Sequence, residues 1–113
     1  MKVAEYHKLG LKHRVDAPPE GYVLLGEARD GGHRVAFYGR VQEGRLERVV
    51  HTGSKRCRKL LALADVAAER LQGQPYPGYQ LALEDLLAFF AGEKDRAKME
   101  ARGRLVLRAL GLA

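Results

Sequence analysis

The stretch YVLLGEARDGGHRVAFYGRVQEGRLERVVH, residues 22–51, decides the fold of this chain. It holds three apolar runs separated by Asp30-Gly31-Gly32 and Gln42-Glu43-Gly44. Both separators predict tight turns, because glycine tolerates positive φ. Apolar and polar side chains alternate along the middle run, as they do in a strand with one buried face. We therefore predict an antiparallel meander of three strands, at residues 22–28, 34–41 and 45–51.

The spacing of apolar residues changes after Gly53. Apolar or small residues recur at helical spacing from position 57 to position 71, with Ser54 predicted as the N-cap and Gly73 as the end. Similar patterns predict helices at 81–90 and 95–110, and a short helix at 3–11 before the strands. Strands and helices are thus segregated along the chain. The predicted fold class is α+β, with a three-stranded antiparallel sheet followed by three helices on one face, in a single domain spanning 1–113.

Composition narrows the classes of function. The chain has 113 residues, a net charge of +6 and one cysteine, Cys57, which excludes an internal disulfide and fits a reducing compartment. No apolar run reaches the length of a membrane span or of a secretory signal, so we expect a cytoplasmic protein without a membrane partner. The 20 Lys and Arg are interleaved with 14 acids, and the one dense basic run, 54–59, contains no aromatic residue. Nucleic acid is therefore not the expected partner.

Cys57 is the one strong nucleophile in the sequence. It stands near the start of the predicted helix, where backbone N–H groups favour a thiolate, and the basic side chains of Arg56 and Arg58 favour it further. Cys57 also continues the apolar stripe of Leu60 and Leu61, as a structural core cysteine would. The residue pattern alone leaves both interpretations open and leans toward the core.

The other reactive side chains form no recognisable catalytic set. The four histidines, His7, His13, His33 and His51, lack the spacing of a zinc site, and no glycine-rich phosphate loop joins a strand to a helix. General acid–base catalysis needs at least two convergent groups. We therefore do not expect an enzyme.

The order of elements and several local patterns resemble the iron–sulfur cluster scaffold family of IscU and the N-terminal domain of NifU. Residues 31–37 are similar to the family's Cys-Gly-Asp turn leading into its second strand, and residues 42–49 to the strand–turn–strand step that follows. The spacing from Cys57 to 72–74 resembles the helix that runs from the family's second cysteine to Lys-Gly-Lys. Residues 96–101 stand where the family has Lys-x-His-Cys-Ala. The resemblance spans about residues 3–112 and implies an IscU/NifU-N/SufE-like fold.

The resemblance also shows which ligands have changed. The family's scaffolds bind a cluster or zinc through three cysteines helped by an aspartate and a histidine. Of those positions only Cys57 is kept, and the others carry the following residues: Gly31, His33, Lys98 and Met99. One thiolate per chain does not supply the four ligands of a [2Fe–2S] cluster. We therefore predict a degenerate member that does not hold an iron–sulfur cluster by itself, with Met99 also fitting the apolar stripe of the last helix.

Three hypotheses about function follow. In the first, the protein is an accessory or adaptor in sulfur or iron–sulfur metabolism, its partner is a cysteine desulfurase or another assembly protein, and Cys57 accepts a persulfide. The implied binding residues are Cys57, His33, Lys98 and Arg56. In the second, His33, Cys57 and Met99 form a rebuilt metal site for Cu(I) or Zn²⁺. In the third, the positive charge binds nucleic acid or an acidic partner protein. An oligomerising domain remains the plainest alternative.

Overall fold

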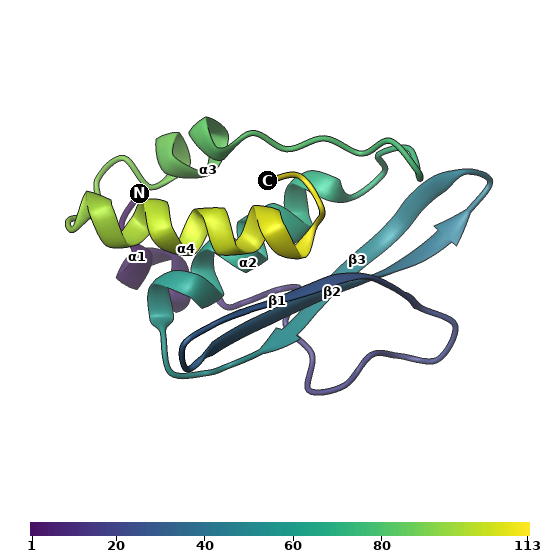
Figure 1. Cartoon of the computed structure of the whole chain (residues 1–113), viewed down its shortest axis with the longest axis horizontal. Coiled ribbons are helices and arrows are strands. Elements are labelled where there is room, and N and C mark those ends of the chain that lie inside the picture. Colours follow the sequence, from purple (N-terminus) through teal and green to yellow (C-terminus); the bar gives the residue numbers. More distant parts are fainter.

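The computed structural model describes residues 1–113 and contains three strands and four helices (Figure 1). The elements follow one another in the order α1 (Val3–Leu9), β1 (Val23–Asp30), β2 (His33–Gln42), β3 (Arg45–Gly53), α2 (Arg58–Leu71), α3 (Leu83–Phe89) and α4 (Arg96–Ala109). The predicted α+β class is confirmed: one antiparallel sheet, in the order β1-β2-β3, precedes three helices, and the short N-terminal helix makes the fourth. None of the helices has both the length and the apolar character needed to cross a bilayer.

Both predicted turns join neighbouring strands. Glu43 and Gly44 form the two-residue turn between β2 and β3, and both have positive φ, at 52° and 73°. A hairpin turn of this kind needs left-handed backbone at both central positions, which explains the glycine. Gly31, with φ of 59°, opens the turn between β1 and β2. Short-range turn chemistry therefore sets the pairing next to each turn, and a register shift follows in each strand pair, at Leu24/Gly26 and at Arg40/Val41.

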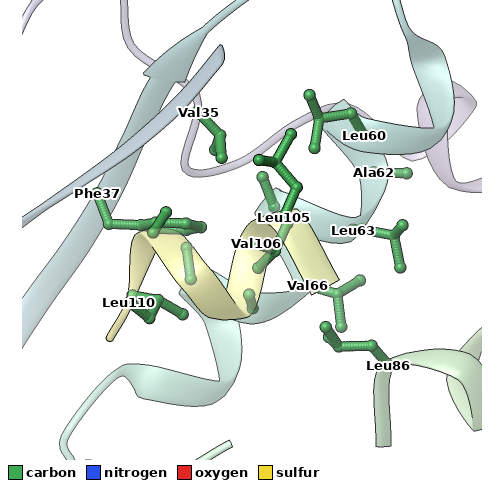
Figure 2. Packing of buried hydrophobic residues seen from close by; sticks show 14 of the residues in the cluster. Val35, Phe37, Leu60, Ala62, Leu63, Val66, Leu86, Leu105, Val106 and Leu110 are labelled. Carbon is green, nitrogen blue, oxygen red and sulfur yellow. The ribbon is translucent and has the colours of Figure 1, made fainter. Parts of the chain in front are cut away.

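Helices cover one face of the sheet and close the core. Figure 1 shows α2 and α4 lying over the sheet, with α4 against β1 and β2 and α2 against β3. In Figure 2, Phe37 of β2 points toward Val106 and Leu110 of α4. At Gly26 a Cβ atom would lie 1.9 Å from the carbonyl oxygen of Ala109, so only glycine lets the end of α4 approach β1 this closely. This contact fixes the last helix on the sheet.

The start of α2 differs from the prediction in one respect. Cys57, not Ser54, is the N-cap residue, and helical geometry begins at Arg58. The Ser54 side chain has another partner, because its Oγ accepts a hydrogen bond from the backbone N–H of Arg34 at 2.8 Å. A tertiary contact with β2 therefore takes the hydroxyl that the sequence pattern assigned to capping.

Candidate functional site

The residues singled out from the sequence come from three elements that meet at one end of the sheet. Ser54 connects the segment before α2 to the β1–β2 turn, since its Oγ lies 2.8 Å from the Arg34 nitrogen and 3.4 Å from the Gly32 oxygen. The guanidinium of Arg56 lies beside Gly32, where a Cβ atom would be 3.4 Å from its Nη1. The start of α2 is thus anchored on the turn that carries His33.

Cys57 has the position of a helix cap but not its hydrogen bond. Its side chain caps none of the first N–H groups of α2, and its thiol has no hydrogen-bond partner within the chain. The residue is partly buried and packs against the edge of the core. The structure therefore places Cys57 between the two interpretations left open by the sequence: the residue packs against the core but is not fully buried.

His33 contacts the last helix instead of a metal-ligand partner. Arg102 of α4 donates a hydrogen bond from Nη2 to Nε2 of His33 at 3.0 Å. A guanidinium has only donors, so His33 Nε2 carries the lone pair and the ring proton sits on Nδ1. His33 Nδ1 and Arg102 Nε are both buried, and neither has a partner within the chain. This contact leaves two buried donors unpaired within the protein.

The two residues from the start of α4 lie in different environments. Lys98 is exposed, and its backbone nitrogen is capped by the side chain of Asp95 at 3.2 Å. Met99 is fully buried and belongs to the hydrophobic core. No three His, Cys, Asp or Glu side chains lie together in a group that could hold a metal ion. The structure thus brings the Cys57 segment, the His33 turn and α4 together. The Met99 side chain, however, is buried in the hydrophobic core.

A second polar cluster, centred on Asp65, was not predicted from the sequence. Asp65 lies in the middle of α2 and is fully buried. Its Oδ2 accepts hydrogen bonds from Tyr6 Oη at 2.7 Å and from the Lys12 nitrogen at 3.1 Å. Its Oδ1 accepts from the His13 nitrogen at 2.9 Å and from His51 Nε2 at 2.8 Å. One carboxylate therefore joins α1, the following segment, β3 and α2.

The burial of this cluster sets the charge of its members. Burial lowers the pKa of His51, outweighing the attraction of Asp65, so the ring is neutral. Burial raises the pKa of Asp65, but the hydrogen bonds that it accepts, the one from His51 foremost, outweigh burial and lower the pKa. Asp65 therefore stays ionised. Burial and the bond to Asp65 raise the pKa of Tyr6, which keeps its hydroxyl proton as a donor. We define Asp65, Tyr6, His51 and the N–H groups of Lys12 and His13 as the Asp65 cluster.

The sequence contains one indication of this cluster, namely a charged residue inside an apolar helix. Asp65 is the one charged residue within the otherwise apolar or small run 60–68. A carboxylate inside such a run must be paired, because an unpaired buried charge is too costly. The pattern does not identify the partners, which stand up to 59 residues away in the chain.

Cys57 lines none of the hollows in the surface. One, of about 280 Å³, is bounded by side chains of α1, α2 and α3, among them Tyr6, Glu69 and Phe89. Another, of about 360 Å³, is bounded by the starts of α1 and α2 and by Glu93 and Lys94. Cys57 lines neither of them. The thiol is therefore not at the bottom of a pocket.

Comparison with known proteins extends the description of the fold but not of the function. No protein-family model and no curated protein matches this sequence. Among solved structures, the chain is similar to one described as "Crystal structure of a hypothetical protein at 2.3 A resolution", with a TM-score of 0.56 and 15% identity. The similarity covers 96% of this chain and 93% of the other. At this identity the likeness shows a shared α+β fold alone.

Proposed function

We propose that this protein is an accessory component of sulfur or iron–sulfur metabolism in which Cys57 accepts sulfur as a persulfide. The observation that carries the proposal is the placement of Cys57. Cys57 is a half-buried residue at the N-cap of a 14-residue helix, its side chain caps none of the helix N–H groups, and the β1–β2 turn and α4 meet nearby. A thiol that lines no pocket suits exchange with another protein better than catalysis on a small substrate, which needs an enclosing pocket.

The charges around Cys57 favour an anionic sulfur. Exposed Arg56 and Arg58 flank it in the chain, and the first N–H groups of α2 point toward its position. Positive charge and helix N–H groups stabilise both a thiolate and the terminal sulfur of a persulfide.

The proposed reaction is a sulfur transfer that needs no external oxidant. The Cys57 thiolate attacks the outer sulfur of a persulfide carried by a donor protein such as a cysteine desulfurase. The sulfur–sulfur bond of the donor breaks, its cysteine leaves as a thiolate, and Cys57 becomes the persulfide. The sulfane sulfur keeps its oxidation state, and the number of thiolates is unchanged.

The residues present do not fit a cluster-holding scaffold within one chain. Cys57 is the one thiolate, His33 Nε2 is engaged by Arg102, and the Met99 sulfur is in the core. A [2Fe–2S] cluster needs four ligands, mostly thiolates. The same arrangement gives no support to the copper or zinc site of His33, Cys57 and Met99. We therefore propose a role in carrying or delivering sulfur, with the cluster built elsewhere.

Intact-mass spectrometry tests the proposal. The protein is incubated with a cysteine desulfurase and cysteine, without added thiol, and the expected product is heavier by one sulfur atom, about 32 Da. The Cys57→Ser variant replaces one atom and must show no adduct, while its circular dichroism matches that of the wild type. Absence of the adduct, or its persistence in the Cys57→Ser variant, would reject the proposed function.

A further inference from the structure

A basic hollow lies between the start of α1 and the start of α2, and Arg58, the residue after Cys57 in the chain, is one of its lining residues. Its volume is about 360 Å³. The residues that define it here as the basic hollow are Lys2, Val3, Arg58, Lys59, Glu93 and Lys94. They come from three separate places in the chain, namely the start of α1, the start of α2 and the connection from α3 to α4. Arg58 directly follows Cys57 in the chain, so the hollow is one residue along the chain from the proposed sulfur-accepting residue.

The single carboxylate of the hollow is already used inside the protein. Glu93 pairs through Oε2 with the ammonium of Lys59, and its Oε1 accepts a hydrogen bond from the Val3 nitrogen at 2.8 Å. The side chains of Lys59 and Glu93 are only 18% and 12% exposed. This shielded pair fixes the floor of the hollow and satisfies Lys59, but it neutralises none of the other cations.

Three cations of the hollow have no carboxylate partner. Lys2, Arg58 and Lys94 are exposed, and none of them takes part in an ion pair. Glu5 lies close to Lys2, but its Oε1 accepts from the Lys2 backbone nitrogen at 2.8 Å. The hollow therefore presents three unpaired positive charges on three different elements, held in place by the Lys59–Glu93 pair.

We propose that the basic hollow docks an acidic segment of a partner protein and, resting on the proposed function, that this partner is the sulfur donor. Carboxylates spaced along one peptide match cations spread over three elements better than one compact phosphate does. The lining offers no aromatic ring on which a nucleobase would stack, which disfavours nucleic acid. Electrostatic docking beside Cys57 raises the encounter rate and orients the donor persulfide toward the thiol.

Fluorescence anisotropy tests the docking without using sulfur chemistry. The probe is a fluorescein-labelled peptide of six glutamates, compared with the same peptide made of six glutamines, at low salt. We expect the acidic peptide alone to bind, and we expect added salt to weaken it, because exposed charges are screened. The variant R58E/K94E is expected to bind at least about tenfold more weakly, and R58Q/K94Q, which disturbs folding less, to fall in between.

Matched controls separate this surface from general positive charge. Arg48 is an exposed arginine on β3 without an ion pair, and R48E is expected to change binding by less than about twofold. The Cys57→Ser variant is expected to bind like the wild type. If the peptide binds but no persulfide forms, the docking proposal is supported and the sulfur-transfer proposal is rejected. If the persulfide adduct forms but the peptide does not bind, the reverse holds.

Several results would overturn the proposal. One is equal binding of the glutamate and glutamine peptides. Another is an equal loss of peptide affinity in R48E and in R58E/K94E, and a third is the absence of glutamate-peptide binding at low salt. Displacement of the peptide by an equimolar amount of inorganic phosphate would instead assign the hollow to a small anion. Tighter binding of a generic DNA duplex than of the acidic peptide would assign it to nucleic acid.

Discussion

The molecule contains two histidine clusters that differ in what the histidine contacts. In the Asp65 cluster, His51 donates to a buried carboxylate that accepts four hydrogen bonds. At the Cys57 end, His33 accepts from the cation of Arg102, and two buried donors stay without a protein partner. The Asp65 carboxylate is fully hydrogen-bonded within the chain, whereas the His33–Arg102 contact leaves a donor unpaired on each of its two side chains.

This difference separates a structural role from a functional one. A buried charge whose hydrogen bonds are all satisfied connects elements of the fold, and the removal of one member leaves the others unpaired. Donors without acceptors cost free energy in the free protein, and that cost is recovered when an acceptor arrives. The following predictions test the contrast, from the largest expected effect to the smallest.

Removal of the Asp65 carboxylate should cause the largest loss of stability. The Asp65→Ala change leaves the Tyr6 hydroxyl, the His51 ring and two backbone N–H groups buried without their acceptor. We expect the free energy of unfolding to fall by about 3–5 kcal/mol, measured by urea denaturation. Asp16→Ala, at a highly exposed carboxylate, is the matched control. A loss below about 1 kcal/mol at Asp65 would contradict a structural role.

Acidification should remove stability through the same cluster. The pKa of His51 is lowered from 6.5, so its contribution is complete above pH 6.5 and is lost as the pH falls below that value. The pKa of Asp65 is lowered from 3.8, so its contribution is complete above pH 3.8 and is lost on further acidification. Urea midpoints measured from pH 7.5 downward should therefore decrease.

The Asp65→Asn variant serves as the comparison for that titration. It retains the size of the side chain but cannot ionise, so the part of the acid loss that depends on Asp65 should disappear. Identical pH profiles for the variant and the wild type would show that other groups cause the acid loss.

Removal of one donor from the cluster should have a smaller effect. In Tyr6→Phe the ring keeps its edge contacts with Phe89 and Phe90, and only the hydrogen bond to Asp65 Oδ2 is lost. We expect a loss of about 1–2 kcal/mol by urea denaturation. Tyr22→Phe is the control, because the Tyr22 ring packs with Arg40 away from this cluster. An unchanged urea midpoint in Tyr6→Phe would mean that the hydrogen bond from the Tyr6 hydroxyl to Asp65 does not contribute to stability.

The smallest effect on stability is expected at His33. Its ring pairs with a cation and leaves a donor unpaired, so we expect His33→Gln to change the free energy of unfolding by no more than about 0.5 kcal/mol. The same variant is expected to load less sulfur on Cys57 than the wild type does, in the intact-mass assay. A large loss of stability with normal sulfur loading would make the two histidine clusters alike and remove the contrast.

The fold could be predicted from the sequence because its signals act over short distances. The turns at Gly31 and Glu43-Gly44 set where the strands begin to pair, and the apolar spacing after position 57 indicated α2. The site was predicted only in part. Cys57 was placed correctly near the start of a helix, but the contact between His33 and Arg102 joins residues 69 positions apart and left no local signal.

The sequence by itself determined the order of the elements, the antiparallel meander and the single thiol. Each of these depends on neighbouring residues, through turn conformation, side-chain alternation and helical spacing. The tertiary structure alone decided that Ser54 binds β2, that Asp65 unites three other segments and that three unpaired cations line one hollow. The physical reason is that a polar side chain takes the partner that docking brings within reach, and docking is a property of the assembled core.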